Sequence, residues 1–212
     1  MSTSDTALLV IDMQNAFCHP AGSIPTLMAP LVNNDAVLER NVEALARARA
    51  AGLPVIFTRH CWDHSMVDAG LSYLAPLSEA DQLISKQMRD SGALVQGSWD
   101  ADVVEQLTPE TGEFVIDKPR YDAFLGTRLE QLLRGLGTEK LIVTGVVTNI
   151  CVESTVRSGY MRDYRMTVAA DCVTAQTERL HANALEAMDL GRFAQVQPLD
   201  EISGLPLPAA VA

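Results

Sequence analysis

The chain has 212 residues, a length that fits one ordinary α/β domain with a core large enough to fold without disulfide staples. Its formal net charge of −11 is spread without a long acidic run, which argues against binding to nucleic acid or to an anionic membrane. No apolar run approaches the roughly 20 residues that a membrane-spanning helix needs.

The first half of the chain alternates strand and helix patterns. Residues 6–12 are apolar on both faces, as a buried parallel strand should be. A long, proline-rich connection over 18–34 leads to an amphipathic helix predicted over 35–51. A strand over 54–59 follows, and the stretch 60–99 is the least regular part of the chain.

The second half continues the alternation. Its expected elements are, in order, a helix over 100–107, strand 113–117, helix 127–136, strand 141–144, a helix from Cys151 to Asp163, strand 165–170, helix 178–190 and strand 193–196. The pattern predicts an α/β fold with a doubly wound, mostly parallel sheet of about six strands and helices on both faces. No glycine-rich phosphate motif follows the first strand, which argues against a dinucleotide site.

The stretch from Lys140 to Arg157 contains the strongest candidate for chemistry. An apolar strand ends at Gly145, and a turn rich in Thr and Asn leads to Cys151 at the expected start of a helix. Unpaired N–H groups and the helix dipole favour a thiolate at such a position, and a thiolate is a nucleophile. The alternative interpretation makes Cys151 a small buried hydrophobic residue, the commoner fate of a free cysteine.

Two other predicted strands end in ionisable residues, Asp12 and Lys118. Because the carboxyl ends of parallel strands meet at one edge of a sheet, we expect both side chains to lie near Cys151. A strand-end Asp is more commonly a cap or turn residue, and a strand-end Lys more commonly reaches solvent. The next expected helix begins far beyond Asp12, so capping explains that residue poorly.

Three segments resemble, in order, the motifs of the isochorismatase-like cysteine hydrolases. They are Leu8-Leu-Val-Ile-Asp-Met-Gln-Asn-Ala-Phe17, Val115-Ile-Asp-Lys-Pro-Arg-Tyr-Asp-Ala-Phe124 and Gly145-Val-Val-Thr-Asn-Ile-Cys-Val152. The likeness runs from about residue 6 to about residue 198. It implies the isochorismatase-like, Rossmann-like three-layer form of the fold, as a single domain over 1–212.

The resemblance also implies roles for the three candidate residues. Cys151 would attack a carbonyl carbon, Asp12 would act as general base and then as acid, and Lys118 would hold positive charge beside both. In this family a non-proline cis peptide precedes the cysteine by four residues, which places it here between Val146 and Val147. The N–H groups of Val147 and Cys151 would then form the oxyanion hole.

Five residues near these motifs are candidates for substrate binding. Phe17, Trp62, Tyr121 and Phe124 are expected to form pocket walls, and Asn149 either holds the turn or points at substrate. For Trp62, simple packing is an equally good interpretation.

A cluster of possible metal ligands follows the second strand: His60, Cys61, Asp63 and His64. Nicotinamidases carry an Asp-x-His pair here, but in this chain the Asp and the His are adjacent. We therefore expect no metal, and no organic cofactor, because a thiolate and water suffice for the chemistry.

The motifs look closest to the ureidoacrylate and biuret hydrolase branch of the family. This implies cleavage of a C–N bond in a small linear amide or ureido compound through a covalent acyl-enzyme, with release of ammonia. Alternatives are a nicotinamidase- or N-carbamoylsarcosine-type amidase, a non-catalytic isochorismatase-like scaffold, and a redox-sensing Cys151. A non-catalytic scaffold would not need the intact set of Asp12, Lys118 and Cys151.

The remaining expectations concern location and assembly. Four cysteines without a CxxC pair, and a start that lacks the features of a signal peptide, predict a cytoplasmic protein. The expected partner is a small-molecule substrate, and the family resemblance implies a homo-oligomer, a dimer or tetramer. The Pro/Ala-rich tail over 204–212 is expected to be loosely ordered or packed on a partner subunit.

Overall fold

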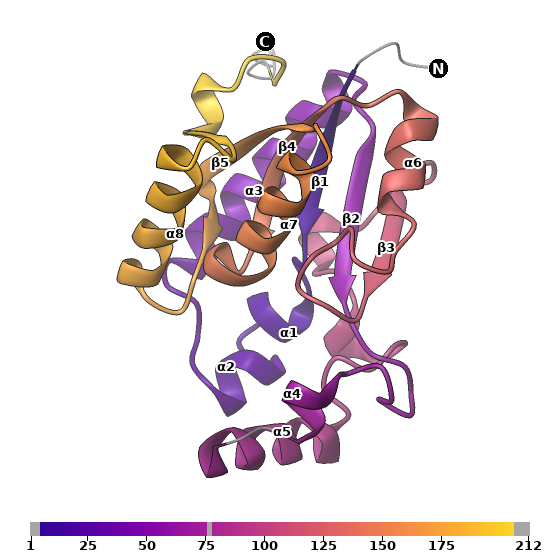
Figure 1. The fold of residues 1–212 in the computed structure, drawn as a ribbon, viewed down its shortest axis with the longest axis vertical. Coiled ribbons are helices and arrows are strands. Elements are labelled where there is room, and N and C mark those ends of the chain that lie inside the picture. Colours follow the sequence, from indigo (N-terminus) through magenta and orange to yellow (C-terminus); the bar gives the residue numbers. More distant parts are fainter. Residues whose placement is uncertain (1–4, 76–77, 206–212) are drawn as a thin grey trace.

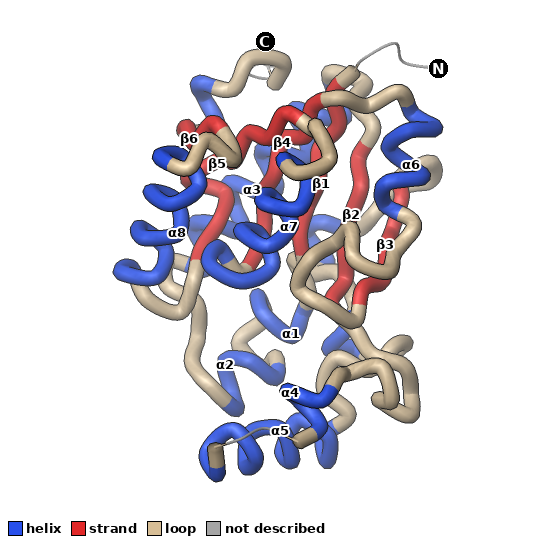
Figure 2. The backbone as a smooth tube through the Cα atoms, viewed as in Figure 1, coloured by secondary structure: helices blue, strands red, loops and turns tan. Residues whose placement is uncertain are grey.

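A computed structural model describes residues 5–75 and 78–205. Its centre is a six-stranded, all-parallel sheet with the strand order β3-β2-β1-β4-β5-β6 (Figures 1 and 2). The strands are β1 (Thr6–Ile11), β2 (Val55–His60), β3 (Phe114–Lys118), β4 (Lys140–Val146), β5 (Arg165–Thr174) and β6 (Gln195–Gln197). The predicted fold class is therefore confirmed.

Helices cover both faces of the sheet, with α3 behind it and α6, α7 and α8 in front (Figure 1). Their bounds are α3 (Asn34–Ala50), α6 (Leu129–Leu136), α7 (Glu153–Tyr160) and α8 (Glu178–Leu190). Four further helices lie beyond the carboxyl ends of the strands, at the bottom of the view. They are α1 (Asn15–Cys18), α2 (Ser23–Leu27), α4 (Leu71–Leu74) and α5 (Glu79–Ser91).

The central strand β1 explains why the sheet has a core on each side. Successive side chains of a strand point to opposite faces, and every β1 residue from 7 to 11 is buried. Leu8 and Val10 join the core under α3, whereas Leu9 and Ile11 join the core under α6, α7 and α8. The continuous apolar run of this strand is thus a consequence of double coverage.

The order of the strands creates a switch point between β1 and β4. From β1 the chain winds outward to β2 and β3, and it then returns to β4 and winds the other way. Ligands of open α/β sheets bind outside the carboxyl ends of the strands at such a point. Asp12 follows β1 there, and the turn that contains Cys151 follows β4.

Gly145 allows the two central strands to approach at this edge. Its φ is +107°, and an added Cβ atom would lie 2.0 Å from the backbone oxygen of Ile11, its partner in the ladder. No other residue type fits between β1 and β4 at this level.

Two sequence-based elements need correction. The helix expected over 100–107 is two 3₁₀ turns, because the chain between them pairs with the segment after β1 through a bridge from Val103 to Gln14. Cys151 does not open an α-helix: it lies inside a π-helical turn, Thr148–Val152, and α7 begins at Glu153. That helix also ends at Tyr160, before Asp163.

The helix α5 was not predicted, although its caps are visible in the sequence. The Ser78 side chain accepts a hydrogen bond from the Asp81 N–H, and Gly92 ends the helix in the left-handed conformation. Both are standard helix boundary signals. The helix was missed because only Ser85 and Met88 are buried, so its apolar stripe is weak.

Two remaining expectations concern the tail and membranes. Most of the predicted tail, residues 206–212, lies outside the described residues, while Leu205 is buried in the core under α3. Within the described part of the chain, every helix is too short or too polar to cross a bilayer.

Candidate active site

Asp12, Lys118 and Cys151 meet at the carboxyl edge of the sheet. Nζ of Lys118 lies 2.7 Å from Oδ2 of Asp12, and both side chains are fully buried. The Cys151 thiol forms side-chain hydrogen bonds with both residues and is only 3% exposed. A nucleophile, a proton acceptor and a cation are therefore in direct contact in a site that excludes bulk water.

Thr58, at the carboxyl end of β2, fixes the Asp12 carboxylate from the other side. Its hydroxyl donates a hydrogen bond to Oδ1 at 2.6 Å. The Asp12 backbone N–H donates to the carbonyl oxygen of Thr58 at 3.1 Å, and Asp12 itself has a φ of +51°. A non-glycine residue with positive φ is uncommon, and such positions concentrate at functional sites.

Burial raises the pKa of the Cys151 thiol, and the neighbouring Asp12 raises it further, while Lys118 lowers it. The net effect is an increase, which corrects the expectation that this cysteine rests as a thiolate. The expectation rested on the unpaired N–H groups and the dipole of a helix N-terminus, but the sulfur is enclosed. The resting sulfur therefore carries its proton, and attack requires the proton to move to a base in contact with it, such as Asp12.

Lys118 keeps its charge in spite of full burial. Desolvation disfavours the ammonium form, but Asp12 and Cys151 together raise the pKa above its ordinary value. Nζ also donates a hydrogen bond to the backbone carbonyl of Arg120 at 3.1 Å. The lysine therefore supplies a fixed positive charge next to the sulfur.

The turn that contains Cys151 is closed by its own backbone. The carbonyl of Val147 accepts from the N–H groups of Ile150 and Val152 at 3.0 and 3.2 Å. The peptide bond between Val146 and Val147 is cis, at the position that the motif indicated. The hydroxyl oxygen of buried Thr148 lies 3.0 Å from Nδ1 of His181 on α8, and this contact ties the turn to that helix.

A family model, the isochorismatase domain, matches residues 6–201 of this sequence. The chain belongs to the isochorismatase family. The resemblance found in the three motifs is thus confirmed for nearly the whole chain.

Individual relatives and solved structures agree with this assignment. Ureidoacrylate amidohydrolase RutB of Methylobacterium radiotolerans is 36% identical, over 97% of this chain and 82% of the relative. The protein of the same name from Pantoea ananatis is 40% identical, over 78% of this chain and 68% of the relative. A cysteine hydrolase from Pseudomonas syringae pv. phaseolicola has a TM-score of 0.78 at 28% identity, covering 93% and 90%. N-carbamoylsarcosine amidase from Thermoplasma acidophilum has a TM-score of 0.71 at 25% identity, covering 93% and 98%.

These names support the enzyme class expected from the sequence, a hydrolase of C–N bonds in linear amides. The cysteine-hydrolase and amidase structures also share the fold of this isochorismatase-family chain over more than nine-tenths of its length.

Beside the Lys118 end of the site lies a small cavity of about 290 Å³, here called the aromatic pocket. It is lined by His60, Trp62, Ala69, Gly70, Leu71, Tyr73, Pro119, Arg120 and Tyr121. The centroids of the Trp62 and Tyr73 rings lie 4.3 Å apart, and the His60 ring packs against those of Trp62 and Tyr121. His60 pairs with Lys118 in the sheet, so the pocket adjoins the trio.

The structure brings only part of the predicted substrate-binding set to this pocket. Trp62 and Tyr121 line it. Phe124 is buried against Tyr164 in the core, and Phe17 lines a different cavity next to the 18–34 connection. Asn149 is half-buried, and its Oδ1 has no hydrogen-bond partner among the described residues.

The possible metal ligands after β2 do not converge. His60 is buried in the pocket wall, whereas Asp63 is exposed and accepts hydrogen bonds from Ser65. In the described residues, no group of three or more His, Cys, Asp or Glu side chains is arranged to bind a metal ion.

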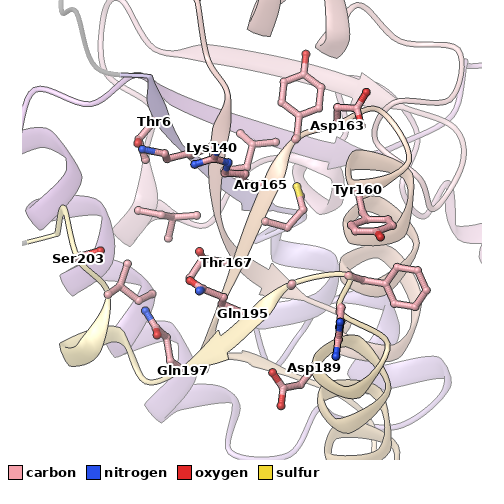
Figure 3. Close-up of a pocket in the computed structure, with 18 of the residues that line it drawn as sticks. Thr6, Lys140, Tyr160, Asp163, Arg165, Thr167, Asp189, Gln195, Gln197 and Ser203 are labelled. Carbon is pink, nitrogen blue, oxygen red and sulfur yellow. The ribbon is translucent and has the colours of Figure 1, made fainter.

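Another cavity, of about 910 Å³, is at the opposite edge of the sheet (Figure 3). Thr6, Lys140 and Arg165, which line it, begin β1, β4 and β5. It therefore lies at the amino ends of the strands, away from the trio.

Sequence reasoning assigned no role to the residues that hold the site together. Gln14 is fully buried: its amide group donates to the carbonyls of His60 and Ala101, and it accepts from the His60 N–H at 2.7 Å. Thr58 was also overlooked, although a polar residue near the end of a buried strand beside β1 was a usable signal.

The contact of Thr58 with Asp12 leads to a test. In the nearly isosteric variant Thr58→Val, Asp12 loses its 2.6 Å hydrogen bond and its fixed orientation. We expect kcat/KM to fall about 10-fold, the equivalent of one lost buried hydrogen bond to a charged group. Steady-state ammonia release measures it, with Thr127→Val as the control on a threonine outside the site. Unchanged kcat/KM in Thr58→Val would remove Thr58 from the positioning of Asp12.

Proposed function

We propose that this isochorismatase-family protein is a cysteine-dependent amidohydrolase that cleaves a C–N bond of a small linear amide or ureido compound and releases ammonia. The observation that carries the proposal is the buried contact among Cys151, Asp12 and Lys118 at the switch point of the sheet. The names of the relatives, ureidoacrylate amidohydrolase and N-carbamoylsarcosine amidase, support the same bond type.

The first half of the reaction forms an acyl-enzyme. Sγ of Cys151 attacks the carbonyl carbon of the substrate, and its proton passes to the Asp12 carboxylate, which is in contact with it. The tetrahedral intermediate then loses its amine as the C–N bond breaks. Asp12 returns the proton to that nitrogen, so that ammonia leaves and a thioester or thiocarbamate remains on Cys151.

The second half regenerates the enzyme. Water attacks the acyl carbon and gives a proton to Asp12, the C–S bond breaks, and the proton returns to sulfur. The product is the acid or, from a ureido compound, a carbamate. Throughout both halves Lys118 stays protonated, and its charge stabilises the negative charge that passes between sulfur and carboxylate.

The negative oxygen of each tetrahedral intermediate needs preorganised donors. We assign this role to the N–H groups of Val147 and Cys151, on the turn after β4. The contact between Thr148 and His181 supports the assignment, because it anchors the turn to α8.

A substrate panel tests the proposed function directly. We expect ammonia release from at least one of ureidoacrylate, biuret, an N-carbamoyl amino acid, maleamate or a simple aliphatic amide, with nicotinamide a poorer substrate. Coupled glutamate dehydrogenase detection measures release, and Cys151→Ala serves as the blank. If the folded protein releases no ammonia from any compound of the panel, the result would contradict an amidohydrolase of this substrate class and favour the non-catalytic alternative.

A further inference from the structure

His181, on the first turn of α8, contacts the turn that contains Cys151. Its Nδ1 lies 3.0 Å from the hydroxyl oxygen of Thr148, whose side chain is fully buried. Among the described residues, this is the only side-chain hydrogen bond that joins the turn, Thr148–Val152, to a neighbouring helix. His181 takes no part in the proposed proton transfers, so its contact with the turn calls for a separate role.

One arrangement of this hydrogen bond satisfies both partners. Burial lowers the pKa of His181 below its ordinary value, and Glu178, which raises it, does not reverse the effect. The imidazole is therefore neutral near pH 7, with one nitrogen that donates and one that accepts. The Thr148 hydroxyl has no other hydrogen-bond partner among the described residues. Its proton is therefore paired only if Nδ1 accepts it and the ring proton is on Nε2.

The helix α8 is a rigid anchor for the contact. Its first turn is capped by Thr177, whose hydroxyl accepts from the Leu180 N–H at 3.2 Å and whose carbonyl accepts from the His181 N–H at 3.0 Å. Leu180 packs against the core under α3, and Met188 lies in the core on the opposite face of the sheet. His181 therefore holds Thr148 from a helix that its cap and two cores keep in place.

Thr148 lies between the two groups assigned to the oxyanion hole. It follows Val147 directly and precedes Cys151 by three residues. The bonds from the N–H groups of Ile150 and Val152 to the Val147 carbonyl close the turn on itself, but they do not connect it to α8. Donors stabilise an oxyanion best when they are already oriented before the reaction. A contact that fixes Thr148 therefore fixes the backbone that carries both donors.

We propose that His181 is a positioning residue, which holds the turn of Cys151 through Thr148 in the orientation that stabilises an oxyanion. It acts on the turn and not on the sulfur. The assignment rests on the proposed chemistry of Cys151. It requires that loss of the contact slows a step that forms a tetrahedral oxyanion and leaves the reactivity of the sulfur itself unchanged.

Two reactions of Cys151 separate these effects. With p-nitrophenyl acetate, the C–S bond forms through a tetrahedral oxyanion, the thiol proton passes to Asp12, and p-nitrophenolate leaves as the C–O bond breaks. Iodoacetamide alkylates the same sulfur by displacing iodide from a saturated carbon, without an oxyanion. We expect His181→Phe to slow acylation about 10-fold, the equivalent of one lost buried hydrogen bond, and to leave alkylation within about 2-fold of the wild type. Cys151→Ala supplies the background of both rates.

Further variants separate the contact from the ring that makes it. His181→Asn keeps an acceptor near the position of Nδ1 and should recover most of the acylation rate, whereas Thr148→Val should match His181→Phe. The double variant Thr148→Val/His181→Phe should be no slower than either single variant, because both remove the same bond. His19→Phe is the matched control. Nδ1 of that exposed histidine accepts from the Ala21 N–H at 3.1 Å, so its loss should change neither rate.

NMR of the ring nitrogens adds a measurement that needs no reaction, since Nδ1 of His181 should carry no proton near pH 7. A proton on Nδ1, an unchanged acylation rate in His181→Phe, or equal slowing of acylation and alkylation would overturn the assignment. A double variant about 100-fold slower would also overturn it, because the two residues would then act independently. A wild type that shows the expected pattern but releases no ammonia from any amide would contradict the proposed amidohydrolase and leave the role of His181 standing.

Discussion

Cys151→Ala should abolish turnover while leaving the fold intact. The substitution removes the sulfur that interacts with both Asp12 and Lys118, and with it the covalent intermediate of the proposed mechanism. We expect kcat to fall by about 10⁴-fold or more, as when the nucleophile of a catalytic triad is lost. Asp12→Asn, which keeps the shape but cannot take the proton, should cost about 10²- to 10⁴-fold. Ammonia release and circular dichroism measure the two effects.

Cys172→Ala is the matched control for this result. Cys172 is also a buried, free cysteine, but it belongs to the core on the α3 face of the sheet, whereas Cys151 belongs to the opposite core. The control variant should lose about 1 kcal/mol of stability and keep its turnover. Wild-type ammonia release by Cys151→Ala would show that the sulfur is not the nucleophile.

Lys118→Met should produce the largest loss of stability of any substitution in the site. Methionine fills a similar volume, but it leaves the fully buried Asp12 carboxylate without a cation. Breaking a buried ion pair from one side costs about 3–5 kcal/mol, because the remaining charge is uncompensated. Turnover should fall by about 100-fold or more, since in the proposed mechanism the same ammonium stabilises the charge that moves between sulfur and carboxylate. Urea-induced unfolding at pH 7 measures the first effect and steady-state kinetics the second.

Two controls isolate the effect of the buried pair. Lys86→Met breaks the ion pair with Asp90, in which the lysine side chain is 64% exposed, and should change the free energy of unfolding by about 0.5 kcal/mol or less. The double variant Asp12→Asn/Lys118→Met removes both charges and should be more stable than Lys118→Met alone. A double variant as unstable as the single one would mean that lost packing, not charge, causes the effect.

Local patterns in the sequence predicted the fold and the position of Asp12, Lys118 and Cys151. The helix expected over 178–190 coincides with α8, and the apolar run of β1 predicted a strand covered on both faces. Strand-end positions alone placed Asp12, Lys118 and the turn before Cys151 at one edge, since parallel strands align their carboxyl ends. Hydrophobic periodicity is a short-range property, so each chain segment reveals it by itself.

Where the sequence pattern was weak or misleading, long-range contacts decided the structure. The chain over 100–107 has a helical composition, but its backbone pairs with the segment after β1 and forms two 3₁₀ turns instead. The turn after β4 encloses Cys151, so burial dominates its pKa and the sulfur rests as a thiol. Desolvation depends on every neighbour of the sulfur, most of which are distant in sequence.

By itself, then, the sequence determined the fold class, the family and the three side chains in contact at the carboxyl edge, because these follow from local periodicity and motifs. The tertiary structure decided which groups surround them. Thr58 reaches Asp12 across two neighbouring strands, and the aromatic pocket joins the end of β2, the turn before α4 and the loop after β3. Such contacts depend on how separate segments pack, and no single stretch of sequence encodes them.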